Sequence, residues 1–345
     1  MTTTETDILV IGAGPAGSSA AIEARLAGAR VIVVERTQHV GDEARGVGFA
    51  PKLFASGLPI PRILLCEPIA GTRIHLEGEV HERNWPGVTI PVRNLFRVLA
   101  GTASDLGADY RSGLEINAIT PNAEALFTSP TDRLEVRAKV AIACDGTHSK
   151  TARLLDMGRQ PHLQVYQCEA LLLEESDWIE LHIDRRLFGG CAWVYPRRTT
   201  ASIGVAVAER AHAEAPMLLE WFREMLVEKG VIAPQSINRT SGPIPSGGLR
   251  PSVRVGQVLL AGDAAGTAHP MGVAGIHPAM ESGRMAGRAA AAFVRGDLDA
   301  LQGYEKSLRG WLSGIFSRAL SRRQFLESAW DRTDFRSLVL DTCLG

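Results

Sequence analysis

The sequence has no pair of cysteines at the C-x-x-C spacing, and its five cysteines lie far apart, at Cys66, Cys144, Cys168, Cys191 and Cys343. A structural zinc site or a disulfide framework would need closely patterned cysteines, so neither is indicated. Scattered thiols are typical of a reducing compartment, which predicts a cytoplasmic protein.

An excess of charge and a long apolar run are also missing. Lys and Arg number 37 against 38 Asp and Glu, which leaves a formal net charge of −1. Without a surplus of positive charge, nucleic acid is not expected as the main partner. No apolar run reaches the ~18 residues of a membrane span, and the polar start lacks a signal-peptide pattern. We therefore expect a soluble protein, or one that touches a membrane only peripherally.

What the chain does contain begins at its N-terminus, with the motif Gly12-Ala-Gly-Pro-Ala-Gly17. The motif lies between a β-branched run at residues 7–11 and an alanine-rich helical stretch that ends near Ala27. A second run at residues 31–35 follows and ends in the acidic Glu35. A strand, a glycine loop, a helix and a strand in this order, with an acidic residue about 20 positions on, are typical of a dinucleotide-binding β-α-β unit.

Each member of this motif has its own task in such a unit. Gly12 allows the tight turn, Gly14 lets the main chain approach a pyrophosphate, and Gly17 lets helix and strand pack closely. Free N–H groups at the helix start would face the phosphates, and Glu35 would accept hydrogen bonds from ribose hydroxyls. The alternative is a structural β-α-β unit with an incidental glycine loop. The predicted cofactor-binding residues here are Gly12, Gly14, Pro15, Ala16, Gly17, Glu35 and Arg36.

Two further apolar runs, residues 141–145 and 258–263, each end in an aspartate beside a glycine. Ligands of open α/β sheets bind at the carboxyl ends of the strands, so both aspartates are predicted at a binding edge. A structural turn is the alternative. A glycine-rich stretch then leads into a helix expected from Pro278 to about Val294, whose start would stabilise a negative charge. The predicted binding residues of these stretches are Asp145, Gly146, Gly262, Asp263, Gly272, Ala274, Gly275 and Ile276.

The three motifs, in this order, resemble the FAD-dependent family typified by p-hydroxybenzoate hydroxylase. Residues 262–283 and 191–196 are similar to its geranylgeranyl reductase branch, and the resemblance covers about residues 6–305. It implies FAD as cofactor and an α/β fold, with a Rossmann-like FAD-binding domain and an inserted antiparallel-sheet substrate domain. The expected domains are the FAD-binding domain at residues 1–160 and 251–305, the sheet at 161–250 and a helical segment at 306–345.

The resemblance also implies a substrate wall. In that branch an aromatic-x-Trp-x-Phe-Pro segment lines the substrate cavity, which makes Cys191, Trp193 and Tyr195 the predicted substrate-binding residues. Aromatic side chains on strands are also common in an ordinary core, and this alternative stays open.

Four basic side chains complete the candidate site. Arg93, at the start of a helix expected over residues 94–106, and Arg45 are predicted FAD contacts, with helix-surface solvation as the alternative. His269 and His277 flank the glycine-rich stretch at residues 270–276, which is expected to contact the flavin, and are the predicted catalytic proton carriers. A structural hydrogen bond is the alternative for each histidine.

Three functions stay open at this point. The first is an FAD oxidoreductase that takes electrons from NADPH or NADH and reduces a C=C bond of an apolar, prenyl-like substrate. The second is a flavin monooxygenase that hydroxylates an aromatic ring or a peptide side chain, and the third is a flavin-binding partner or maturation protein. Residues 308–330 either pack on the core or lie on a membrane as a basic amphipathic helix.

Overall fold

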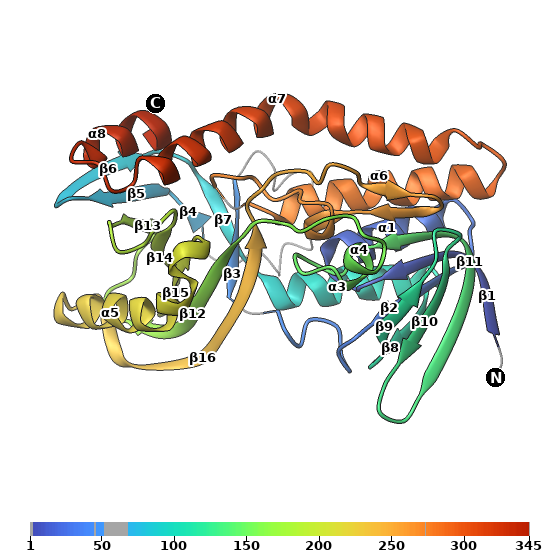
Figure 1. Cartoon of the computed structure of the whole chain (residues 1–345). Coiled ribbons are helices and arrows are strands. Elements are labelled where there is room, and N and C mark those ends of the chain that lie inside the picture. Colours follow the sequence, from blue (N-terminus) through green and yellow to red (C-terminus); the bar gives the residue numbers. More distant parts are fainter. Residues whose placement is uncertain (1–2, 45, 52–67, 273, 345) are drawn as a thin grey trace. The chain divides into compact units, whose positions relative to one another are not determined.

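A computed structural model of the chain describes residues 3–44, 46–51, 68–272 and 274–344, and its elements are shown in Figure 1. The chain divides into two compact units. The first unit comprises residues 1–44, 93–160 and 245–318, and the second unit comprises residues 45–92, 161–244 and 319–345. Compared with the expected domains, residues 45–92 join the sheet-bearing unit. Arg45, a predicted FAD contact, lies outside the described residues.

The first unit is built on an eight-stranded sheet whose main path runs β17-β18-β11-β1-β2-β8. The strands β18, β11, β1, β2 and β8 pair in parallel, whereas β10 and β9 extend from β11 in antiparallel fashion. The strands are β1 (Thr3–Ile11), β2 (Val31–Glu35), β8 (Asp109–Ser112), β9 (Glu115–Ile119), β10 (Glu124–Thr128), β11 (Arg133–Ala143), β17 (Arg254–Val255) and β18 (Val258–Leu260).

The central strands of this sheet are apolar on both faces. On β1, Ile8 and Val10 belong to one core cluster, whereas Leu9 and Ile11 belong to another. Burial of one such side chain contributes about 1.5–3 kcal/mol, which explains why a parallel strand with two covered faces reads as a continuous apolar run. The predicted Rossmann-like α/β fold is confirmed.

Helices α1 and α6 of the first unit pack closely because one of them carries glycines at the contact. A Cβ atom on Gly283 or Gly287 of α6 would collide with the carbonyl oxygen of Ala16 or Ala20 of α1. The predicted helix at 278–294 begins two residues earlier than expected. The helical elements are α1 (Pro15–Leu26), α3 (Val92–Asp105), α4 (Lys150–Leu154), η3 (Gly262–Ala264) and α6 (Ile276–Val294).

The second unit contains a seven-stranded sheet in the order β16-β12-β15-β14-β13-β5-β6 and a three-stranded sheet in the order β3-β7-β4. Within the sheet predicted at residues 161–250, the strands β12, β15, β14 and β13 pair in antiparallel fashion, as expected. The sheet is not purely antiparallel, because β13 pairs in parallel with β5. The strands are β3 (Val47–Pro51), β4 (Pro68–Ile69), β5 (Gly71–Leu76), β6 (Glu79–Arg83), β7 (Gly87–Pro91), β12 (His162–Leu172), β13 (Trp178–Ile183), β14 (Cys191–Arg197), β15 (Thr200–Val207) and β16 (Ile232–Pro245).

One face of this sheet is covered by helix α5 (Ala215–Glu228), which follows the short helix η2 (Glu209–Glu214). Val194 of β14 and Ile203 and Val205 of β15 are buried against Phe222 of α5 in one core cluster. Side chains alternate along a strand, so the residues between them lie on the other face. We call this the Trp193 face; it carries Gln167, Cys191, Trp193, Tyr195, Ser202 and Gly204.

The C-terminal stretch forms the long helix α7 (Ala300–Ser328), then α8 (Phe335–Val339) and the π-helical turn η4 (Leu340–Leu344). Of the two alternatives for residues 308–330, packing on the core agrees with the burial of Leu308, Leu312, Ala319 and Leu326. Ile315, in contrast, is 54% exposed. In the part of the chain that the structure describes, no helix is long and apolar enough to cross a membrane.

Candidate functional site

The glycine loop of the first unit contains two glycines that the protein itself requires. Gly12 has φ +95°, and a Cβ atom there would lie 2.5 Å from the carbonyl oxygen of Cys144. A Cβ atom on Gly17 would overlap the carbonyl oxygen of Gly12. Both positions therefore exclude any side chain, as the β-α-β prediction expects for the turn and for close helix packing.

Gly14 differs, because the protein leaves room for a side chain there. The nearest atom to a Cβ at this position is a ring carbon of Phe96, at 3.8 Å. Gly14 is the N-cap of α1, and no side chain caps the helix start or brings acidic charge to its first turn. Packing within the protein therefore does not require glycine at this position, and the N–H groups at the helix start still need an acceptor. Both features fit a pyrophosphate that approaches the main chain closely.

Glu35, at the end of β2, links the glycine loop to the strand edge. Its Oε2 accepts a hydrogen bond from the N–H of Ala13 at 2.8 Å. Its Oε1 accepts from the N–H and the hydroxyl of Thr37 at 2.9 and 3.0 Å. A carboxylate has about four acceptor positions, so Oε2 keeps capacity for a ribose hydroxyl.

The two predicted aspartates lie beyond the ends of the adjacent strands β11 and β18, as expected, but their surroundings differ. Asp145 accepts hydrogen bonds from the hydroxyl of Ser149 at 2.6 Å and from the N–H of Thr151 at 2.9 Å, so it organises the start of α4. Among the described residues, Asp263 accepts a side-chain hydrogen bond from the hydroxyl of Thr147, at 3.4 Å. Burial raises the pKa of Asp263 to about 6. Hydroxyl groups of a bound ligand would donate hydrogen bonds to this carboxylate and reduce the free-energy cost of burying its charge.

A buried arginine that the sequence reasoning missed holds these motifs together. Arg250 is 3% exposed, and its Nε donates to the carbonyl of Ala264 at 2.7 Å. Its Nη1 donates to the carbonyls of Gly158 and Met157 at 2.5 and 3.3 Å. Burial lowers the pKa of Arg250, whereas the charge of Asp145 acts in the opposite direction. A lone arginine in a Gly- and Pro-rich stretch carries no periodic signal, and only the fold reveals it.

His269 closes the loop that follows Asp263. Its N–H donates to the carbonyl of Ala274 at 3.1 Å, and its Nδ1 accepts from the N–H of Gly272 at 3.0 Å. Its ring packs edge-on against Phe316, and burial lowers its pKa. With Nδ1 as acceptor, the neutral ring carries its proton on Nε2.

His277 lies in the first turn of α6, and its ring centroid is 6.2 Å from that of Trp311. Burial also lowers the pKa of His277, and the neighbouring Glu281 acts against this. Both histidines are therefore mostly neutral near pH 7, and either would have to bind an additional proton before it delivers one.

The remaining predicted FAD contacts of the first unit are placed as follows. Arg93, in the first turn of α3, donates to the carbonyl of Asp42 at 3.4 Å. Arg36 is exposed and forms an ion pair with Glu43. Gly275 is the N-cap of α6, and Ile276 begins that helix. The loop 269–276 and the glycine loop thus both precede a helix start.

The predicted substrate wall lies on the second unit. Trp193 and Tyr195 are half-buried, with ring centroids 6.3 Å apart at 75°. Cys191 is on the same side of β14. Burial raises the pKa of the Tyr195 hydroxyl, which is neutral at physiological pH. The three side chains point away from α5, so they are not part of the core beneath that helix.

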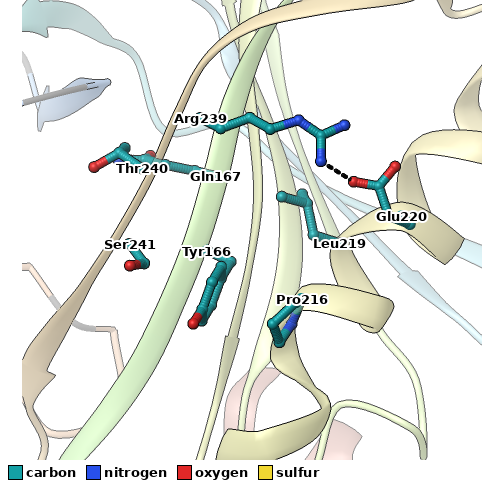
Figure 2. Close-up of a pocket in the computed structure, with 8 residues that line it drawn as sticks. All are labelled: Tyr166, Gln167, Pro216, Leu219, Glu220, Arg239, Thr240 and Ser241. Atoms are coloured by element: carbon teal, nitrogen blue, oxygen red, sulfur yellow. Dashed lines mark hydrogen bonds and ion pairs between the residues drawn. The ribbon is translucent and has the colours of Figure 1, made fainter.

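A pocket of about 250 Å³ is present on the opposite side of the same sheet (Figure 2). It lies between β12, β16 and α5, where Arg239 and Glu220 form an ion pair. Its walls include Tyr166 and Leu219, and it contains none of the predicted site residues.

Comparisons with known proteins agree with the geometry of the first unit. A family model described as FAD binding domain matches residues 5–224. A digeranylgeranylglycerophospholipid reductase of Methanosarcina acetivorans is 31% identical over 82% of this chain and 74% of its own length. Another from Methanocella arvoryzae is 28% identical over 95% of this chain and 89% of its own.

The fold is shared with a solved structure. A geranylgeranyl bacteriochlorophyll reductase-like protein from Thermoplasma acidophilum superposes with a TM-score of 0.85. The match covers 98% of this chain and 90% of that protein, at 22% identity.

Proposed function

The chain belongs to the FAD-binding flavoprotein family of the digeranylgeranylglycerophospholipid reductases, and on this premise we propose that it reduces a C=C bond of an apolar, prenyl-like substrate with NADPH or NADH as electron donor. That it is an FAD-dependent oxidoreductase follows from the family. The substrate class is inferred from the similarity to these reductases over most of the chain. The fold alone would not support that inference, because one fold can support several flavin chemistries.

The first unit offers the groups that would hold FAD. Gly14 and the start of α1 would receive the pyrophosphate, and Glu35 would accept from the ribose. Asp263 would accept from hydroxyl groups of the cofactor, and the start of α6 would favour a negative charge on the flavin. When bound, FAD supplies hydride transfer; the protein supplies orientation and the exclusion of water.

Saturation of a C=C bond adds a hydride and a proton, so the protein must also deliver a proton. We assign this role to His269 or His277. The hydrogen bond from the N–H of Gly272 to Nδ1 leaves the proton of His269 on Nε2. Because burial lowers the pKa of His269, an experiment must separate a catalytic role of this ring from a structural one. A His269→Gln variant that keeps FAD, and whose turnover is strongly reduced with a changed pH profile, would support the proton role.

The substrate and its source complete the proposal. Trp193, Tyr195 and Cys191 would form an apolar wall for a prenyl chain. We place the protein in the cytoplasm with peripheral contact to a membrane, the source of such a substrate. In helix α7, Trp311 and Ile315 are 37% and 54% exposed on the flank that also carries Arg318. Exposed apolar groups beside a cation favour the surface of an anionic bilayer.

An anaerobic turnover experiment tests the proposal. The holoenzyme is mixed with NADPH or NADH and a geranylgeranyl lipid without oxygen, and the products are analysed by mass spectrometry. We expect bleaching of the flavin and a product heavier by two hydrogens for each double bond reduced. A product that forms only with isotopically labelled O₂ and contains the label would establish the monooxygenase instead. A flavin that neither nicotinamide bleaches would favour a binding protein.

A further inference from the structure

Three strands of the second unit bring Gln167, Gly204 and Trp193 into one row on the Trp193 face. Gly204 of β15 is paired with Trp193 on β14 and with Gln167 on β12. A Cβ atom at Gly204 would lie 2.7 Å from indole Cε2, closer still to Cζ2, and 2.8 Å from the Cβ of Gln167. The indole therefore lies directly against the main chain of β15, in the space that any other residue would fill.

The two faces of β15 differ strongly in side-chain volume. Towards α5 the strand presents Ala201, Ile203, Val205 and Val207, which are all fully buried. On the Trp193 face it presents Thr200, Ser202, Gly204 and Ala206. Packing against α5 cannot explain this, because these small residues point the other way. The small residues on this face leave room for the Trp193 indole to lie against β15 at Gly204.

Ser202, the neighbour of Gly204 on this face, already has a hydrogen-bond partner. The hydroxyl of Ser202 donates to Oε1 of Gln167 at 3.2 Å, and Ser202 is 2% exposed. The largest surfaces beside Gly204 are the rings of Trp193 and Tyr195. A wall made of aromatic rings, with its hydroxyl already hydrogen-bonded, suits a hydrocarbon chain.

We propose that Gly204 is a specificity-determining residue, because the absence of its side chain sets how deep the Trp193 indole lies and thereby the length of prenyl chain that the wall accepts. This inference rests on the proposed function. A methyl group at residue 204 would push the rigid indole off the sheet, towards a bound chain, and shorten the chain that the wall accepts. Loss of the indole would have the opposite effect.

The test compares two oxidised holoenzyme variants, Gly204→Ala and Trp193→Leu, with two probes that bear a geranylgeranyl and a farnesyl chain. Equilibrium dialysis gives the dissociation constant for each probe, and anaerobic turnover gives kcat/KM. Gly204→Ala is expected to reduce the preference for the longer chain by about tenfold, the usual effect of a methylene-sized change in an apolar pocket. Trp193→Leu should shift the preference towards the longer chain.

The double variant makes the mechanism specific. If Gly204→Ala acts by displacing the indole, it should have little effect once Trp193 is leucine, so the two changes will not be additive. Gly242→Ala is the matched control, because Gly242 is on β16 of the same sheet and a Cβ atom there has open space. Its chain-length preference should equal that of the wild type. FAD content, measured in every variant, reports whether the fold is intact.

The outcomes separate this inference from the proposed function. Shifted dissociation constants without turnover would support the role of Gly204 and contradict prenyl reduction. Wild-type turnover with unchanged preference in both single variants would overturn the inference and leave the function standing. If Gly204→Ala does not fold, Trp193→Leu alone decides, since an unchanged preference there removes the role of the indole. Failure of the wild type to bind either probe would overturn both.

Discussion

The two units present their candidate residues in different ways. In the first unit, the candidate FAD-binding groups lie at or just beyond strand ends, and main-chain hydrogen bonds hold them, as for Glu35 and Asp145. In the second unit, the candidate residues stand on the face of a sheet, where Trp193 is positioned by Gly204 from the neighbouring strand. The position of a candidate residue in a loop is thus set mainly by residues close to it in sequence. The position of a candidate residue on a sheet face depends on the register of separate strands.

The largest expected effect tests the glycine loop of the first unit. Gly17→Ala should destabilise the first unit by more than about 4 kcal/mol, because the new Cβ overlaps the carbonyl oxygen of Gly12. Gly14→Ala is the control: it meets only Phe96, at 3.8 Å, so the melting temperature of the apoprotein should stay unchanged while FAD affinity falls at least about tenfold. Equal melting temperatures for the two variants would contradict this difference. Flavin titration and thermal denaturation measure both.

Two tryptophans of the second unit, compared with each other, test the role of the Trp193 face. Trp330 is 1% exposed and donates from Nε1 to the carbonyl of Arg185 at 2.9 Å, so Trp330→Ala should cost about 3–5 kcal/mol. Trp193 is only half-buried, and Trp193→Ala should lower the melting temperature much less while it changes substrate affinity and preserves FAD content. A loss of stability as large as that of Trp330→Ala would mean that Trp193 is an ordinary core residue.

Arg250 offers a smaller but more specific effect. Arg250→Met should destabilise the protein by about 3 kcal/mol, because the buried carbonyls of Ala264 and Met157 and the part-buried carbonyl of Gly158 lose their donor, and FAD affinity should fall with it. Arg309→Met is the control, since Arg309 reaches the carbonyl of Arg250 from a partly exposed position on α7. It should affect stability less and FAD affinity not at all. The idea fails if both variants bind FAD like the wild type.

The smallest effect is a pH dependence. The folded-state pKa of Asp263 is about 6, against 3.8 for an ordinary aspartate. The folded apoprotein then binds more protons than the unfolded chain between these values, so this group makes the protein less stable as pH rises towards 6. Asp263→Asn should remove that slope, raise the apoprotein melting temperature at pH 7 by a few degrees and weaken FAD binding. Parallel stability curves from pH 5 to 8 would refute the assignment.

Local patterns predicted most of the first unit correctly. The run at residues 31–35 is a strand with those bounds, and the two aspartates follow strands as expected, because apolar runs and glycines act within a few residues. The second unit was harder. Its β5 strand pairs with β13, about a hundred residues later, and no local pattern encodes such a partner. Arg250 and the small residues of β15 gain their meaning only when strands from distant parts of the chain are brought together.

The position of β18 in the first sheet has a consequence for how the chain is made. Ribosomes add about 5–20 residues per second and release the N-terminal part first. β18 pairs with β11 but is separated from it in sequence by residues 144–257, which include most of the second unit. Until β18 leaves the ribosome, the edge of β11 at residues 141–143 lacks its parallel partner strand. A nascent chain stopped near residue 244 would therefore possess the glycine loop, lack Asp263 and expose an edge that invites aggregation.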